Sequence, residues 1–342
     1  MPELAIPPHF DGARTGEVWR VDYGSCASDA EAWAEAHGIG HPSDDERRIG
    51  LLLVDCQNTF CIPGYELFVA GQSGRGAVDD NTRLCRFIYR NLDVITEITA
   101  TLDTHTALQI FHPVFWVNDD GDHPVGGQTE ITLSDVEEGR WSPNPAVADS
   151  LAGGDVEWLR KYARHYVSRV TEGRYPLMVW PYHAMLGSVG HALVSALDEA
   201  VFFHSISRQT AARFEVKGGT PLTENYSVLS PEVTLGPGNE RIASPNLALF
   251  DHLMEFDAVI VAGQASSHCV AWTLHDLLTV IQARDPELAG KIYIMEDCMS
   301  SVVVPRGVDF TEDAEEALHL FEEHGMHRVR STDPISTWEG ME

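Results

Sequence analysis

The sequence predicts an α/β fold, with a mainly parallel sheet covered by helices on both faces in three layers. Short apolar segments alternate along the chain with longer segments whose apolar residues recur at helical spacing. Several of the short segments contain an uninterrupted apolar run, such as LLLV at 51–54 and AVIVA at 258–262, which is typical of strands buried on both faces. Because a helix between two such strands returns the chain to the same edge of the sheet, the strands are expected to run parallel.

The predicted elements follow one another in a regular order. Five apolar segments are predicted strands: 49–55 (IGLLLVD), 95–103 (ITEITATLD), 199–207 (EAVFFHSIS), 257–263 (DAVIVAG) and 291–297 (KIYIMED). Three segments with apolar residues on one helical face are predicted helices: 81–92, 190–200 and 268–283. The chain has 342 residues, 44% of them hydrophobic, and is long enough to bury a large core.

Two stretches fall outside this alternation and set the predicted domain organisation. Residues 1–48 form an N-terminal extension that ends in the charged SDDERR. Residues 49–342 form a single domain with an insertion at about 117–176. The first half of the insertion contains the turn-forming stretches DDGDHPVGGQ and SPNPA.

The second half of the insertion, 155–170, predicts a helix with an aromatic stripe of Trp158, Tyr162 and Tyr166. Such a stripe fits ordinary packing within the domain. At the rim of a pocket it would narrow the entrance or contact a second subunit, and of these two we favour the contact. The protein is therefore expected to be a homo-oligomer.

Composition and charge exclude several classes of protein. The formal net charge of −29 and the lack of basic patches argue against nucleic-acid binding. No apolar run approaches the roughly 20 residues that cross a bilayer, so no membrane contact is expected. The N-terminus has no basic start followed by an apolar block, which predicts a cytoplasmic location. The six scattered cysteines predict reduced thiols rather than a disulfide scaffold or zinc ribbon.

Polar side chains follow the predicted strands at the points where those strands end. They are Asp55, Asp103 with His105, Lys217 after the polar stretch beyond 199–207, and Cys269. In open parallel sheets, ligands bind beyond the carboxyl ends of the strands. Each residue alone has an ordinary structural explanation, but together they predict a site for a small molecule.

Cys269 stands at the start of a predicted helix, where the helix dipole favours a thiolate. A nearby lysine would favour it further. The adjacent His268 points in a different direction and is a poor base for this thiol. Asp55 is the alternative, because it would take the thiol proton and pass it to a leaving amine.

A second group combines Asp103 and His105 with His112 and His183. An aspartate and a histidine two residues apart bind one metal only where the backbone turns. The chain has 16 histidines, so a purely structural role for these stays open.

Five motifs, taken in order, resemble those of the nicotinamidase and isochorismatase-like cysteine hydrolases. The resemblance covers about 49–305, apart from the insertion. The motifs are DCQNTF (55–60), DTH (103–105), WPYH (180–183), KG (217–218) followed by YS (226–227), and GQASSHCV (263–270).

The resemblance implies a catalytic triad of Asp55, Lys217 and Cys269. It also implies an oxyanion hole formed by the backbone amides of Ala265 and Cys269, and a cis peptide bond before Ala265. In the nicotinamidase branch a divalent metal, for which zinc, iron and manganese are the candidates, would lie at the positions of Asp103 and His105. No organic cofactor is implied.

His183 would complete this metal site, and His112 lies near the place of an additional histidine ligand in some members. Phe60, Trp180 and Tyr226 match aromatic residues that line the amide pocket. The sequence departs from the usual nicotinamidase pattern in two motifs: it has DTHT where DWHP is usual, and two serines where Thr-Asp precedes the cysteine block. Tyr226 also comes later after the lysine than usual.

The resemblance therefore implies an amidohydrolase that acts on nicotinamide or a related aromatic or carbamoyl amide. A cysteine thioester would form and ammonia would leave. Two alternatives stay open, an isochorismatase-type vinyl ether hydrolase and a catalytically idle binding protein.

Overall fold

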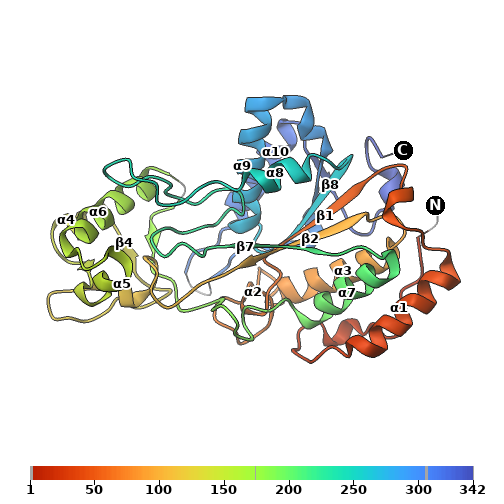
Figure 1. The fold of residues 1–342 in the computed structure, drawn as a ribbon, viewed down its shortest axis with the longest axis horizontal. Coiled ribbons are helices and arrows are strands. Elements are labelled where there is room, and N and C mark those ends of the chain that lie inside the picture. The colour runs from red at the N-terminus through yellow and green to blue at the C-terminus, as the bar shows by residue number, and fades with distance from the viewer. Residues whose placement is uncertain (1–2, 174, 305–306, 342) are drawn as a thin grey trace. The chain divides into compact units, whose positions relative to one another are not determined.

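A computed structural model describes residues 3–173, 175–304 and 307–341. Six strands form one sheet in the order β10-β9-β8-β1-β2-β7 (Figure 1). They are β1 (Ile49–Val54), β2 (Glu97–Asp103), β7 (Arg213–Lys217), β8 (Ala258–Gly263), β9 (Ile292–Met295) and β10 (His327–Val329). The pairs β1–β2, β1–β8, β8–β9 and β9–β10 are parallel, which confirms the predicted mainly parallel sheet, although no strand was predicted at β10.

The chain packs as two compact units. Unit 1 comprises Met1–Leu102, Ala192–Glu215 and Leu247–Glu342. Unit 2 comprises Asp103–His191 and Val216–Asn246. The domain boundaries predicted from the sequence stay a prediction.

Unit 1 has helices on both faces of the sheet, which confirms the predicted three-layer α/β/α fold (Figure 1). On one face lie α1 (Tyr23–His37), α3 (Gly76–Arg90) and α7 (Ser195–Arg208). On the other lie α8 (Leu247–Leu253), α9 (Cys269–Arg284) and α10 (Thr311–Glu323). The short α2 (Asn58–Cys61) follows β1. All residues of β1 and β8 are buried, as expected of central strands between two helical layers.

Helix α1 packs residues of the N-terminal stretch directly onto α7. Cys26 and Ala30 are buried there, and Ser207 Oγ donates a hydrogen bond to the Ala30 carbonyl oxygen. Tyr23 donates its hydroxyl to Asp198 Oδ2 at 2.6 Å. The N-terminal stretch therefore contributes to the helical layer on this face.

The prediction of a strand at 199–207 is wrong, because this segment lies within α7. Aromatic and β-branched residues suggested a strand, but the buried positions Leu197, Ala200, Val201 and His204 follow helical spacing. The strand that leads to Lys217 is instead β7, which is short and lies at the edge of the sheet. Its burial largely alternates, as in an edge strand with one covered face.

Apart from the long helix α6, the helices and strands of unit 2 are short. They are β3 (Trp116–Val117), β4 (Glu130–Ile131), α4 (Leu133–Glu137), β5 (Ser142–Pro143), α5 (Ala148–Ala152), α6 (Val156–Glu172) and β6 (Leu177–Met178). Strand β3 pairs with β5, and β4 pairs with β6, both antiparallel. The predicted helix in the insertion is confirmed as α6.

The aromatic stripe of α6 faces the core of its own unit. Tyr162 and Tyr166 are fully buried beside Phe111 and Trp116, and Trp158 stacks on Tyr162 with ring centroids 5.1 Å apart. The interpretation of this stripe as a subunit contact is therefore wrong, since packing within the unit already buries the two tyrosine rings. The homo-oligomer stays a prediction. Within the described part of the chain, none of the helices is long and apolar enough to cross a membrane.

Candidate active site

In unit 1 the candidate residues lie at the carboxyl edge of the sheet. Strands β1 and β8 are parallel neighbours, and their last residues, Val54 and Gly263, are opposite each other. Asp55 and the turn that leads to Cys269 therefore begin side by side. Gly263 has φ +126°, and a Cβ there would lie 2.1 Å from the Val54 carbonyl oxygen, so only glycine fits this approach.

Asp55 is fully buried and its carboxylate is oriented by Thr101 of β2. The Thr101 hydroxyl donates to Asp55 Oδ1 at 2.5 Å and accepts from the Asp55 backbone N–H at 3.0 Å. Sequence reasoning missed Thr101, although a hydroxyl near the end of a buried strand is the kind of signal that marks such a partner.

The turn between β8 and α9 is held by several hydrogen bonds. Its Gln264–Ala265 peptide bond is cis, as the family resemblance implies. Gln264 Nε2 donates to Asp80 Oδ2 at 2.9 Å, and the Ser300 backbone N–H donates to Gln264 Oε1 at 3.2 Å. The Val270 N–H donates to the Ala265 carbonyl oxygen at 3.1 Å. Asp80 is a second supporting residue that the sequence did not reveal.

Cys269 is the first residue of α9, a helix of 16 residues. The N-terminal end of a helix stabilises negative charge, which favours a thiolate at this position. Burial raises the pKa of Cys26 and of Cys61 to about 12, and raises the pKa of Cys56 well above its ordinary value. Burial acts in the same direction on the remaining two thiols, Cys85 and Cys298. All six cysteines are free thiols, and Cys269 is the one that begins a helix.

His268 is not suited to act as the base for Cys269. Burial lowers the pKa of His268 to about 4. Its Nδ1 forms a hydrogen bond with the Ser267 hydroxyl at 2.9 Å, and its ring packs edge-on against Phe310. These observations argue against His268 as the base, and the role of Asp55 as the base stays a prediction.

In unit 2 the predicted metal ligands come together. Asp103, His105 and His183 are buried, and one ligand atom from each lies within 4.8 Å of the others. Asp103 Oδ2 is 2.7 Å from His105 Nε2 and 3.6 Å from His183 Nε2. The backbone turns after β2, where the His105 N–H donates to the Ala184 carbonyl oxygen. This turn meets the condition that the short Asp-x-His spacing requires.

Lys217 lies against the same aspartate. Its Nζ donates to Asp103 Oδ1 at 2.9 Å and to the Asn225 carbonyl oxygen at 2.7 Å. Burial raises the pKa of Asp103, but the charges of His105 and Lys217 outweigh this effect and hold the pKa well below its ordinary value. Asp103 is therefore an ionised carboxylate, the form that binds a cation.

Two observations show that these residues fit a divalent metal. His105 Nδ1 is buried and has no hydrogen-bond partner among the described residues. Gly218 leaves space beside the group, because a Cβ there would lie 3.1 Å from both His105 Nδ1 and Asp103 Oδ1. One carboxylate and two imidazoles suit zinc, iron or manganese.

His112 lies beside this group but is not one of its three members. Its ring centroid is 5.9 Å from that of His105 and 6.0 Å from that of His183. Burial, followed by the charges of His183 and His105, lowers the pKa of His112 to about 3, so this ring is neutral near pH 7. His112 is thus available as an additional ligand.

The predicted aromatic substrate-binding residues fall in both units. In unit 2, Trp180 Nε1 donates to the Tyr226 hydroxyl at 3.2 Å, and Tyr226 meets Tyr175 edge-on. In unit 1, Phe60 lies in α2 and is almost completely buried. The structure therefore brings Trp180 and Tyr226 together.

Sequence reasoning also missed Glu224, a buried carboxyl in unit 2. Burial, followed by the negative charge of Asp103, raises the pKa of Glu224 to about 7. Glu224 Oε1 accepts a hydrogen bond from the Asn225 N–H at 2.9 Å. No spacing or motif marked this residue, because its position depends on how the loop after β7 folds.

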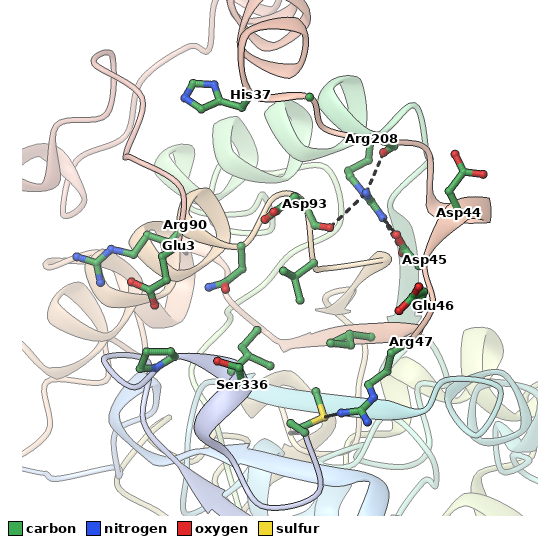
Figure 2. A pocket seen from close by; sticks show the side chains of 18 of the residues that line it. Glu3, His37, Asp44, Asp45, Glu46, Arg47, Arg90, Asp93, Arg208 and Ser336 are labelled. Atoms are coloured by element: carbon green, nitrogen blue, oxygen red, sulfur yellow. Dashed lines mark hydrogen bonds and ion pairs between the residues drawn. The ribbon is translucent and has the colours of Figure 1, made fainter. Parts of the chain in front are cut away.

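A cavity of about 740 Å³ lies elsewhere in unit 1 (Figure 2). Its lining includes Ile49, the first residue of β1, which places it at the amino edge of the sheet. Figure 2 shows Arg208 paired with Asp45 at one end and directed to the Asp93 carbonyl oxygen. None of its lining residues is a predicted site residue, so its size does not make it the active site.

Comparison with known proteins gives likenesses in structure. No protein-family profile matches the chain, and no curated protein matches it in sequence. The nicotinamidase/pyrazinamidase of Acinetobacter baumanii superposes with a TM-score of 0.50 and 21% identity, over 85% of this chain and 99% of that one. The yeast nicotinamidase bound to the inhibitor nicotinaldehyde superposes with a TM-score of 0.50 and 16% sequence identity, over 82% of this chain and 99% of that one. The chain therefore has the fold of these enzymes.

Proposed function

We propose that this protein is an amidohydrolase that cleaves the C–N bond of a small carboxamide through a thioester on Cys269. The observation that carries the proposal is the carboxyl edge of the sheet, where Asp55 and the Cys269 turn follow neighbouring parallel strands. A thiol at the start of a long helix and a buried carboxylate are the two groups that this chemistry requires. The shared fold with two nicotinamidases adds support.

In the proposed reaction, Asp55 accepts the thiol proton and the Cys269 sulfur attacks the amide carbonyl carbon. The backbone N–H groups of Ala265 and Cys269 donate to the oxyanion. Asp55 then gives the proton to the leaving ammonia as the C–N bond breaks. Water, deprotonated by Asp55, hydrolyses the thioester and regenerates the thiol. Lys217 is proposed as the third member of the triad, as counter-charge to the thiolate.

Asp103, His105 and His183 are proposed to hold one divalent metal ion, with His112 as an additional ligand. Such an ion would orient a ring nitrogen of the substrate or a water molecule. The proton transfers proposed for the triad do not involve this ion, because none of them requires Lewis-acid activation of the scissile carbonyl.

Phe60, Trp180 and Tyr226 are proposed to hold the flat face of an aromatic amide. Rings of this kind favour aromatic substrates, because stacked and edge-on contacts add to burial of apolar area. The two proteins of solved structure that share the fold are named as a nicotinamidase/pyrazinamidase and a nicotinamidase. Nicotinamide is therefore the first candidate substrate and pyrazinamide the second.

The proposal predicts ammonia release from aromatic carboxamides. We expect turnover of nicotinamide, pyrazinamide or benzamide to exceed that of acetamide, because acetamide has no ring to contact the aromatic residues. The measurement is coupled detection of ammonia at neutral pH, with zinc, manganese and iron(II) added in turn. A purified, folded protein that released no ammonia from any of these amides with any of the metals would contradict the proposal.

A further inference from the structure

The buried ammonium of Lys217 depends on a main-chain carbonyl of the loop that follows β7. Only 2% of the Lys217 side chain is exposed, and its acceptors include Asp103 Oδ1 and the Asn225 carbonyl oxygen. An ammonium carries three N–H donors, and a buried charge must find acceptors for them in the protein. The position of the Asn225 peptide therefore helps to decide where the Lys217 charge lies.

The backbone at Asn225 is also held by Glu224. The Asn225 N–H donates to Glu224 Oε1, while the Asn225 carbonyl oxygen accepts from Lys217 Nζ. The Glu224 N–H in turn donates to the hydroxyl of Tyr166 at 3.1 Å. Tyr166 belongs to α6, so a chain of three hydrogen bonds joins the insertion helix to Lys217.

A second tyrosine of α6 holds the same loop two residues earlier. The Tyr162 hydroxyl donates to the Leu222 carbonyl oxygen at 2.7 Å. Tyr162 and Tyr166 are one helical turn apart, so both hydroxyls emerge from the same face of α6. Between the two contacts, the Thr223 hydroxyl accepts from the Val233 N–H at 3.0 Å.

Helix α6 is a rigid support for these two hydroxyls. It has 17 residues, begins with an Asp155 side-chain cap on the Trp158 N–H, and buries one face in the core of unit 2. Both tyrosine rings are fully buried, so their hydroxyl positions are fixed by packing. Ordinary core packing would require the rings alone. The hydroxyls are the parts that reach the loop backbone.

We propose that Tyr162 and Tyr166 are positioning residues for Lys217: the insertion helix holds the 222–225 loop so that the Asn225 carbonyl oxygen fixes the lysine ammonium. The proposal rests on the catalytic role proposed for Lys217 above. Neither tyrosine is proposed to touch substrate. Both act through the loop backbone.

The test uses Tyr166→Phe and Tyr162→Phe, which each remove one oxygen and keep the buried ring. The chain has three lysines, Lys161, Lys217 and Lys291, so protein labelled with ¹³C at lysine Cε gives a spectrum of three side-chain signals. Lys161→Arg and Lys291→Arg assign those signals. We expect the Lys217 signal to shift or broaden in both Phe variants.

Lys291 is the internal reference in this spectrum, because its Nζ also donates to two carbonyl oxygens, those of Met254 and Phe256, but lies in unit 1. The matched control variant is Tyr89→Phe, which removes a buried hydroxyl that hydrogen-bonds with His9 in unit 1. It should leave the Lys217 signal and the turnover of amide unchanged.

Kinetics on the best amide substrate give the second measurement. Each Phe variant is expected to lower kcat by about tenfold with KM within about twofold, because a displaced charge affects the reacting state more than substrate binding. A Lys217 signal that stays unchanged in both variants would overturn the proposal. A shifted signal with unchanged kcat would support the loop contact and instead contradict the catalytic role of Lys217.

Discussion

Replacing Cys269 by alanine is expected to abolish amide hydrolysis while leaving the protein folded. The substitution removes the sulfur that would form the thioester, and α9 contains no second cysteine to replace it. Loss of the nucleophile should reduce kcat by roughly 10³-fold or more. Removing one small buried atom should lower stability by only about 1 kcal/mol. Ammonia release measures the first effect, and thermal unfolding measures the second.

Cys26→Ala is the matched control for that variant. Cys26 also lies in the first turn of a helix, α1, and is about as buried as Cys269, at 6% exposed against 8%. Its thiol stays protonated near pH 7, because burial, followed by the charge of Glu199, raises its pKa to about 12. Cys26→Ala should therefore keep full turnover. Equal activity in the Cys269→Ala protein would remove the thioester mechanism.

Replacing His105 by alanine is expected to abolish binding of the metal ion that we propose for this group. The substitution takes one imidazole from a buried three-ligand group and leaves Asp103 and His183, a carboxylate and a single ring. Two ligands hold zinc, iron or manganese far more weakly than three, so the purified variant should contain well below one equivalent. Elemental analysis of the wild type and the variant, purified without chelators, measures this content.

His123→Ala is the control, since His123 also lies in unit 2 but hydrogen-bonds with the Trp116 carbonyl oxygen and is not a member of the group. It should keep the wild-type metal content. His112→Ala distinguishes three ligands from four, because an intermediate content would assign His112 to the site. Equal metal in the wild type and His105→Ala would place the ion elsewhere.

Much of the sheet was predictable because its central strands are buried on both faces. Such strands leave continuous apolar runs, as in β1 and β8, and the residue after each run marks the ligand-binding edge. Asp55 and Cys269 were found in this way. The metal group was found from motif resemblance, since the spacing of Asp103 and His105 alone did not exclude a structural role.

Other features depend on contacts that no local pattern records. The segment at 199–207 has the composition of a strand, yet its burial against α1 and α3 follows helical spacing. Strand β7 is short and partly exposed, so its apolar pattern is weak. The sequence therefore placed Lys217 after a predicted strand at 199–207, although the strand that ends at Lys217 is β7. Strand pairing brings Thr101 to Asp55, and folding of the loop after β7 brings Glu224 to the Asn225 N–H. Neither contact is marked by a local sequence pattern.

The tyrosines of α6 show a different limit. Their helical spacing predicted a stripe, but spacing does not say which surface covers it. In the structure the core of unit 2 covers Tyr162 and Tyr166, and their hydroxyls bond to the loop that leads from Lys217. A pattern of apolar rings thus identified the helix and its buried face, while the role of the polar atoms required the fold.

The central claim is that hydrolysis passes through an acyl group on Cys269, and partitioning with hydroxylamine tests it most directly. The primary amide and the methyl ester of the same aromatic acid are each turned over at one fixed hydroxylamine concentration, with Cys269→Ala as the blank. A thioester common to both substrates predicts the same ratio of hydroxamate to acid, because the leaving group has departed before hydroxylamine or water attacks. Ratios that differ between the amide and the ester would contradict a shared acyl-enzyme.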